Sequence, residues 1–264
     1  MAKKTKPQQI TAAVPALETR PVEHSFFDRP WLPELLLILS VMAVYIMSVP
    51  NGFVFFDDDK AILYNHALQN PSFGKFFSGQ NLGMYAPLTW IAYWVGNLLS
   101  GKEAWGYHAL GMALHALNSV LAFILLRRLT GRSWVAFFAA LLFAVHPMQV
   151  EAVSWAAALS TVLFSTFYLL SVIGYLNWLK QPPSPALKDG GSPDPFWLVI
   201  SIMTFLAACL SKSAAVTLPL VLGAVFFYEN KNVNHCNYSH FSKCNCTNAR
   251  EVQLSGLSVK WPRC

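Results

Sequence analysis

Residues 106–126 read GYHALGMALHALNSVLAFILL, a long apolar run without a charged side chain. A helix needs about 20 such residues to cross the hydrocarbon core of a bilayer. Other apolar blocks lie on both sides of this run and are continuous, as in helices whose outer surface faces lipid. The sequence therefore predicts an all-α, polytopic membrane helical bundle with about six transmembrane helices. The expected spans are 31–50, 106–126, 133–146, 155–178, 195–211 and 214–228.

The composition excludes a soluble domain. Of the 264 residues, 55% are hydrophobic and only 12% are charged, whereas a soluble domain has about 25% charged residues. The net charge of +6 comes from basic residues in the loops between apolar blocks, where such residues set the topology in the lipid bilayer. Nucleic acid is therefore not an expected partner. Cys244 and Cys246 are too close for a zinc knuckle and lack a second pair, so no zinc site is expected.

Three regions follow from this pattern. Residues 1–30 are polar and basic and predict a disordered cytoplasmic arm, residues 31–229 form the membrane domain, and residues 230–264 form a polar cytoplasmic tail. Within the membrane domain, residues 179–194 are rich in proline, glycine and serine, which predicts a linker between two helical groups.

The block 87–99 (PLTWIAYWVGNLL) is apolar but short, so it either spans the bilayer or lies at its interface. The loop charges separate these arrangements. If the block lies flat outside, only four of the 19 basic residues face out, namely Lys60, Lys75, Lys102 and Lys212. Because cytoplasmic loops carry the excess of Lys and Arg, the sequence predicts an interfacial helix on the extracytoplasmic side.

With this topology, the polar residues next to the spans gather on the extracytoplasmic side. Ionisable residues within or beside spans are costly and usually line a cavity, which predicts a functional site there. His108 and His115 are seven residues apart on the second span, and therefore lie on one helical face. The other candidates are Asp57, Asp58 and Asp59 after the first span, His146 and Glu151 after the third, and Lys212 between the last two.

Each candidate also has a purely structural interpretation. Three consecutive aspartates suit a solvated loop, and the two histidines suit hydrogen bonds between helices. Glu151 suits the start of the fourth span, where a negative charge interacts favourably with the helix dipole, and Lys212 suits a loop end. The joint gathering at one side of the membrane favours the functional interpretation.

Five ordered motifs carry a resemblance to a known family. The sequence resembles the membrane O-mannosyltransferases that carry tetratricopeptide repeats, and their bacterial relatives, over residues 31–229. The motifs are FDDDKAILYN at 56–65, YAPLTW at 85–90, GYH at 106–108 with LHALN at 114–118, LFAVHPMQVEAVSW at 142–155 and LSKSAAVTLP at 210–219.

The resemblance implies a GT-C fold and a sugar donor linked to a polyisoprenyl phosphate. It implies transfer to a protein or glycan acceptor at the extracytoplasmic face. Carried over, it implies Asp57 and Asp58 as catalytic residues, because a carboxylate can deprotonate the attacking hydroxyl. Asp58 and Asp59 are the candidate ligands of a divalent metal ion. The candidates for binding the donor phosphate or substrate are Lys212, His146, Glu151, His108 and His115.

The sequence also departs from the family pattern. Gln149 stands where the bacterial relatives usually have a second histidine, and Ala157–Ser160 replaces a charged stretch. The family continues with further spans and a repeat domain, so we expect an incomplete copy. A non-catalytic remnant or subunit is therefore the second hypothesis. The third is a transporter with His108, His115 and Glu151 as a polar relay. The expected location is the bacterial plasma membrane, from similarity to the shorter bacterial members.

Overall fold

The computed structural model describes residues 29, 31–79, 83–181, 194–239, 249–254 and 257–262, with side chains up to residue 231. The predicted cytoplasmic arm 1–30 lies almost entirely outside the described residues, as do the two tail cysteines of the pair considered above. The long helices are α1 (Leu32–Tyr45), α4 (Pro87–Ser100), α5 (Trp105–Thr130), α6 (Ser133–Val145), α8 (Leu159–Leu179), α9 (Phe196–Ser211) and α10 (Leu218–Ser239).

Every predicted apolar block overlaps one of these helices, but some ends differ. The 155–178 block begins with the 3-10 turn η5 (Ala156–Ala158), and α8 starts only at Leu159. α10 continues past the apolar residues to Ser239. Helix ends are set by backbone hydrogen bonds and caps, which do not need to coincide with the ends of an apolar run.

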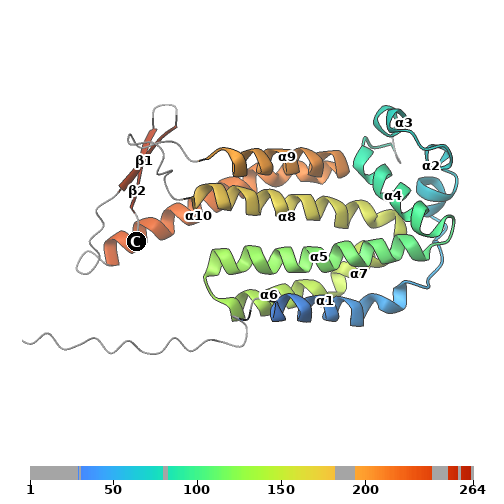
Figure 1. The fold of residues 1–264 in the computed structure, drawn as a ribbon, viewed down its shortest axis with the longest axis horizontal. Helices are drawn as coiled ribbons and strands as arrows, with labels where there is room; N and C mark the ends of the chain where they lie inside the picture. The colour runs from blue at the N-terminus through green and yellow to red at the C-terminus, as the bar shows by residue number, and fades with distance from the viewer. Residues whose placement is uncertain are drawn as a thin grey trace, which may run out of the picture.

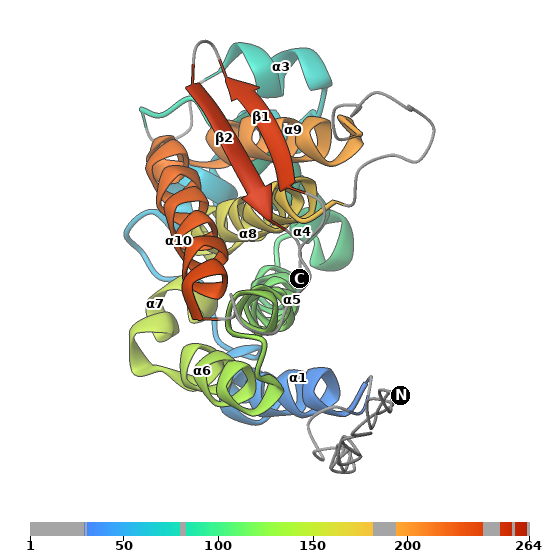
Figure 2. The same ribbon diagram turned by 90° about the vertical axis from the view of Figure 1, so that its left-hand side faces the viewer.

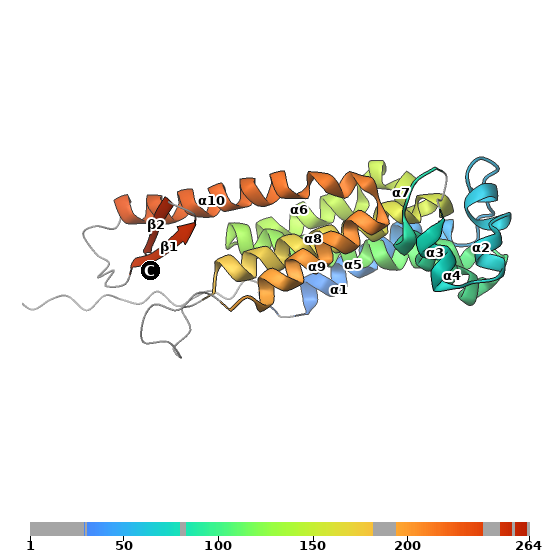
Figure 3. The same ribbon diagram turned by 90° about the horizontal axis from the view of Figure 1, so that it is seen from above.

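The long helices other than α4 run side by side along the long axis of the molecule, as Figures 1 and 3 show for α1, α5, α6, α8, α9 and α10. Seen end-on in Figure 2, α1 and α6 lie on one side, α5 lies centrally, and α8, α9 and α10 lie on the other side. α4 does not run along the bundle but lies at one end of it, next to α3 (Phe73–Ser78) and α2 (His66–Gln69).

Short elements gather towards this same end, which we call the loop end. They are the 3-10 turn η2 (Ile46–Ser48), the π-helical turn η3 (Asp59–Leu63), α2, α3, η4 (Pro147–Gln149), α7 (Val150–Ser154), η5 and η6 (Ser213–Thr217). α4 lies at the loop end and not along the bundle, and the position of the 87–99 block at a membrane interface stays a prediction.

Small and polar side chains allow the helices to pack closely. Between α8 and α9, Ser171 Oγ donates to the Ser201 carbonyl at 2.7 Å, and Ser201 Oγ donates to the Ser171 carbonyl at 2.9 Å. A Cβ at Gly174 would lie 3.3 Å from the backbone of α9. Between α5 and α8, Asn118 Nδ2 donates to the Val162 carbonyl at 2.8 Å. Lipid tails are as apolar as the helix surfaces, so the hydrophobic effect does not drive helices together in a bilayer. Close packing and hydrogen bonds between helices stabilise the association instead.

Three helices within the described residues are long and apolar enough to cross a membrane: Trp105–Thr130, Ala156–Leu179 and Ser213–Lys231. α6 and the segment Pro147–Ser154 would together form a fourth span, but they meet at an angle of 51°. Leu32–Ser48 and Phe196–Ser211 are apolar but shorter. These helices make the chain an integral membrane protein, whereas the count of about six crossings stays a prediction.

The tail differs from the all-α expectation. Strands β1 (Ala249–Leu254) and β2 (Leu257–Pro262) pair antiparallel, with Ala249 opposite Pro262. Apolar residues alternate along both segments, as in Val252 and Leu254 or Val259 and Trp261, and this period of two is typical of a strand. The all-α class therefore holds for the described residues of the membrane domain, and the tail adds a short hairpin.

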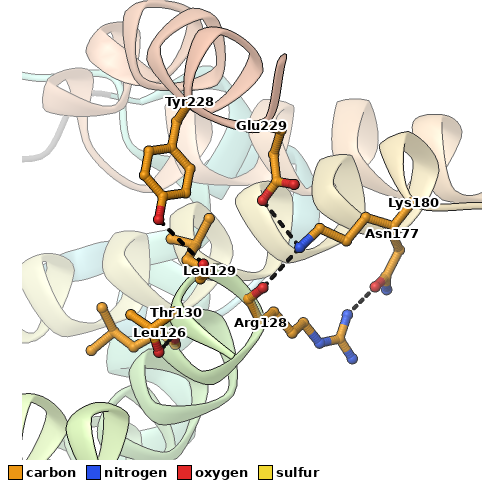
Figure 4. A network of polar contacts seen from close by, with 8 residues as sticks. All are labelled: Leu126, Arg128, Leu129, Thr130, Asn177, Lys180, Tyr228 and Glu229. Atoms are coloured by element: carbon orange, nitrogen blue, oxygen red, sulfur yellow. Dashed lines mark hydrogen bonds and ion pairs between the residues drawn. The ribbon is translucent and has the colours of Figure 1, made fainter. Parts of the chain in front are cut away.

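The end opposite the loop end, which we call the basic end, is joined by a polar network (Figure 4). Lys180 Nζ lies 3.0 Å from Glu229 Oε1 and donates to the Arg128 carbonyl at 2.8 Å. The Arg128 guanidinium donates to Asn177 Oδ1, and Tyr228 OH donates to the Leu129 carbonyl at 3.4 Å. The network connects the C-terminal part of α5 with α8 and α10.

Candidate functional site

The three aspartates of the first loop lie at the loop end but have different surroundings. Asp58 has an exposed fraction of 0%, whereas Asp57 and Asp59 are only half-buried. A carboxylate withdrawn from water needs hydrogen-bond partners, because an unsatisfied charge in the interior is costly. The environment therefore divides the aspartates into one buried group and two accessible groups.

Asp58 receives its partners from two distant parts of the backbone. Its Oδ2 accepts from the Val54 N–H at 2.9 Å, within the first loop. Its Oδ1 accepts from the Ala157 N–H at 2.7 Å, in the turn η5. Hydrogen bonds to a charged acceptor are short and strong, so Asp58 fastens the first loop to the start of α8.

Asp57 keeps an available carboxylate. Within the described part of the chain, no hydrogen bond or ion pair engages its side chain. Its backbone carbonyl accepts from the Ala61 N–H at 2.8 Å, which fixes its position at the entry to the turn η3. Asp59 Oδ1 accepts from the neighbouring Lys60 N–H at 2.8 Å. Of the three aspartates, Asp57 is the one whose carboxylate has no partner among the described residues.

Lys212 lies in the turn between α9 and η6, and it is half-buried. Its Nζ donates to Thr161 Oγ1 at 2.7 Å, close to the N-terminus of α8. A helix N-terminus carries a partial positive charge, so the ammonium group and the helix dipole favour an anion in the same place.

His146 and Glu151 flank the bend between α6 and α7, and both are exposed. His146 Nδ1 accepts from the Met148 N–H at 3.2 Å and so caps the turn η4. Glu151 lies in the first turn of α7 without a partner among the described side chains. Both residues lie in the segment that precedes η5, the turn bound by Asp58.

The structure separates the two histidines of α5. The buried His108 ring lies close to Asp58 and to the carbonyls of Asn51 and Gly52, but neither nitrogen makes a hydrogen bond of normal geometry with the described residues. His115 Nε2 instead contacts the Ala144 carbonyl at 2.9 Å. His108 therefore borders the site, whereas His115 joins α5 to α6.

The described residues contain no group of three His, Cys, Asp or Glu side chains arranged to hold a metal ion. Asp58 uses both oxygens for backbone N–H groups, and one oxygen of Asp59 accepts from Lys60. Divalent cations such as Ca²⁺ and Mg²⁺ need several oxygen ligands directed at one point, and these two carboxylates do not form such a set. The metal assigned to Asp58 and Asp59 stays a prediction, and no chemical step below uses it.

The sequence does not point to Ala157, because its side chain is apolar and the segment Ala157–Ser160 indicates only a loss of charge relative to the family pattern. The structure shows that the backbone N–H of Ala157, not its side chain, contacts Asp58. Any residue except proline supplies this donor. Thr161 was also missed, although a polar residue near the start of an apolar block was an available signal.

Comparison with known proteins finds related transferases. The chain is 32% identical to the human protein O-mannosyl-transferase TMTC4 over 216 residues, which is 72% of the chain and 28% of that protein. It is 33% identical to mouse protein O-mannosyl-transferase TMTC3 over 210 residues, 74% of the chain and 21% of that protein. For Drosophila melanogaster Tmtc2, the values are 30% over 192 residues, 67% of the chain and 20% of that protein. No protein-family model matches the sequence, and no solved structure matches it.

These similarities place the chain among relatives of membrane glycosyltransferases. In particular, it is related to the protein O-mannosyl-transferases of the TMTC type, which confirms the resemblance carried by its motifs. The chain spans only 20–28% of the length of these three relatives.

Proposed function

We propose that this chain is the membrane part of a GT-C type glycosyltransferase. It transfers a sugar from a polyisoprenyl phosphate to a hydroxyl of a protein or glycan acceptor. The observation that carries this proposal is the loop end, where the accessible carboxylate of Asp57 and the ammonium group of Lys212 lie at the same end of a bundle related to protein O-mannosyl-transferases.

Asp57 is the general base in this proposal. The acceptor oxygen attacks the anomeric carbon of the sugar, and the bond from that carbon to the phosphate oxygen breaks. Asp57 takes the proton of the acceptor hydroxyl, and the polyisoprenyl phosphate leaves with the electron pair of the broken bond. Asp58 does not exchange a proton in this scheme. It holds the first loop against η5 and so positions Asp57 next to it.

Lys212 stabilises the departing phosphate. Negative charge develops on the phosphate oxygen in the transition state, and a preorganised cation lowers the energy of that state. The bond from Lys212 Nζ to Thr161 Oγ1 holds the cation near the N-terminus of α8, where the helix dipole acts in the same sense.

The distribution of basic residues supports an extracytoplasmic site. Arg127 and Arg128 end α5, Arg132 precedes α6, and Lys180 follows α8. All of them lie at the basic end, opposite Asp57 and Lys212. Since the cytoplasmic side carries the excess of Lys and Arg, the loop end is proposed to face the extracytoplasmic space.

A second candidate is a non-catalytic remnant or subunit of such an enzyme. The chain covers 28% of human TMTC4, so parts of the relatives have no counterpart in the aligned region. A remnant would retain the bundle and the Asp58 contacts without turnover. The transporter hypothesis has weaker support, because His115, one of the three residues of its relay, is engaged in a contact between α5 and α6.

The decisive experiment measures transfer of radiolabelled sugar from a polyprenyl phosphate in proteoliposomes that contain the purified chain. Replacing Asp57→Asn removes the base with almost no change in shape, and we expect the rate to fall at least about 100-fold, within the range of general base catalysis. Glu103→Gln is the matched control, since Glu103 is an exposed acidic residue just before α5, and it should keep the parent rate.

Two results would contradict the proposal. Equal rates for the parent and Asp57→Asn would exclude Asp57 as the base. Absence of transfer by the parent chain, in a preparation where a full-length relative is active, would favour the remnant.

Sidedness needs a separate measurement. In a variant whose five native cysteines are replaced by serine, single cysteines at positions 57 and 212 should react with an impermeant thiol reagent from the same side of the membrane. A cysteine at position 231, which is exposed and follows Glu229 of the basic end by two residues, should react only from the other side. Labelling of positions 57 and 212 from opposite sides would exclude a common site.

A further inference from the structure

One face of α4 contacts two backbone segments of the candidate site, one next to Asp58 and the other next to Lys212. Thr89 and Tyr93 are four residues apart, so they lie one above the other on the helix. Each has an exposed fraction of only 1%. Buried hydroxyl groups need hydrogen-bond partners, and here both partners lie outside α4.

The two hydroxyl groups bind segments that are far apart in the sequence. Tyr93 OH donates to the Ala157 carbonyl at 2.7 Å, in the turn η5. Thr89 Oγ1 donates to the Ser211 carbonyl at 2.7 Å, at the C-terminal end of α9. Both acceptors are backbone carbonyl oxygens, which a side-chain substitution does not remove. Each contact is therefore removed by replacing the donor, Thr89 or Tyr93.

Each contact lies next to a residue of the site. Ala157 accepts from Tyr93 with its carbonyl while its N–H donates to Asp58. Ser211 directly precedes Lys212, whose Nζ binds Thr161. One residue, Ala157, therefore connects α4 to Asp58, and the residue that α4 binds at the end of α9, Ser211, is the direct neighbour of Lys212.

α4 is itself held against the bundle. A Cβ at Gly96 would lie 2.6 Å from the ring of Tyr107 on α5, so the two helices approach closely there. The Trp90 ring packs edge-on against Phe76 of α3, with ring centroids 6.1 Å apart. A side chain on such a fixed element holds its partner more accurately than one on a loop.

We propose that α4 is a brace that sets the separation between the Asp57–Asp58 loop and Lys212, with Thr89 and Tyr93 as positioning residues. The inference rests on the proposed function, because the separation matters when one group acts on the acceptor and the other on the leaving phosphate. A misplacement of about 1 Å in such an arrangement can reduce the rate by up to about 100-fold.

The test removes one hydroxyl at a time without changing side-chain volume much. We expect Thr89→Val and Tyr93→Phe each to lower kcat for sugar transfer about tenfold, and the double variant to lower it further, while KM for the lipid-linked donor changes less than about twofold. Two controls match these changes. Thr204→Val removes a hydroxyl that bonds within its own helix, and Tyr175→Phe alters a half-buried tyrosine of α8. Neither control should change kcat.

A second measurement does not depend on activity. Spin labels on cysteines that replace Phe55 and Val216, both strongly exposed, report the separation of the first loop from η6 by electron paramagnetic resonance. We expect one narrow distance distribution in the parent and in both controls, and a broader or shifted distribution in Thr89→Val and Tyr93→Phe.

The two measurements separate failure of the brace from failure of the proposed function. If the parent chain transfers no sugar, the proposed function fails, and the distance distributions still decide whether α4 sets the separation. Unchanged distance distributions in the double variant would show that α4 does not set the separation between the first loop and Lys212. Broadened distributions with an unchanged kcat in an active chain would overturn the positioning role of Thr89 and Tyr93.

Discussion

Charged side chains have different kinds of partner at the two ends of the bundle. At the basic end, Lys180 pairs with Glu229 at 3.0 Å and also binds the Arg128 carbonyl (Figure 4). At the loop end, Asp58 is bound by two backbone N–H groups and Lys212 by a hydroxyl. No ion pair joins an aspartate of the first loop to a cation within the described residues.

This difference separates a structural network from a site. At the basic end, the Lys180–Glu229 ion pair and the bond from Arg128 to Asn177 join three helices, so these contacts account for the presence of those three charged groups. The charges of the loop end are held in position by neutral groups and keep their electrostatic effect. Such preorganised charges are what the proposed function requires of Asp57 and Lys212.

The largest expected effect on stability belongs to Asp58. Asp58→Asn keeps the shape but replaces one acceptor oxygen with an NH₂ group, which faces a backbone N–H at Val54 or Ala157. We expect the free energy of unfolding to fall by about 2 kcal/mol, since a charge-assisted hydrogen bond is lost and a buried donor is left unpaired. Unfolding by a denaturing detergent, followed by circular dichroism in mixed micelles, measures this change.

Asp57→Asn is the matched control for this prediction, because Asp57 is half-buried and lacks a described partner. Its free energy of unfolding should change by less than about 0.5 kcal/mol, as for other substitutions away from buried networks. Equal destabilisation by the two variants would show that the aspartates do not differ as the structure indicates.

The contact between Ser171 of α8 and Ser201 of α9 involves no charged side chain, and its effect on stability can be compared with that of the charged contacts at the two ends. Ser201→Ala removes the bond from Ser201 Oγ to the Ser171 carbonyl and leaves the bond from Ser171 Oγ to the Ser201 carbonyl in place. We expect a loss of about 1 kcal/mol, in the range of hydrogen bonds between membrane helices. Ser40→Ala, which removes a bond within α1, should cost less. A larger effect at Ser40 would contradict this account of α8–α9 packing.

The smallest effect is expected at the basic end. Glu229→Gln removes the charge from the ion pair, in which Lys180 is 42% exposed and Glu229 14% exposed. Ion pairs that solvent reaches contribute about 0.2–1 kcal/mol, so the loss should be near the lower end and should decrease with added salt. Sugar transfer should not change. If Glu229→Gln lowered the free energy of unfolding more than Asp58→Asn, the basic end would contain the more important charged contact, which would contradict this account.

Much of the architecture could be predicted from the sequence, because long apolar runs require helices in a bilayer. The blocks around α5, α8 and α9 coincide with helices within a few residues, and the short block 87–99 coincides with a helix at the loop end. The motifs also predicted the relationship to O-mannosyl-transferases that the comparisons confirm. The hairpin of β1 and β2 was missed although apolar residues alternate in both segments, because each segment has only six residues.

The order of apolar and polar residues determined the helices, and together with the loop charges it predicted that the aspartates, His146 and Lys212 lie at one end of the bundle. Successive helices run in opposite directions along the bundle, so every second connection between them lies at the same end, whatever its side chains are. Only the tertiary structure decided that Asp58 is buried, that Asp57 is accessible, and that Ala157 and α4 support the site. Those contacts use backbone N–H and carbonyl groups, which every residue carries apart from the proline N–H, so no pattern of side-chain types can reveal them.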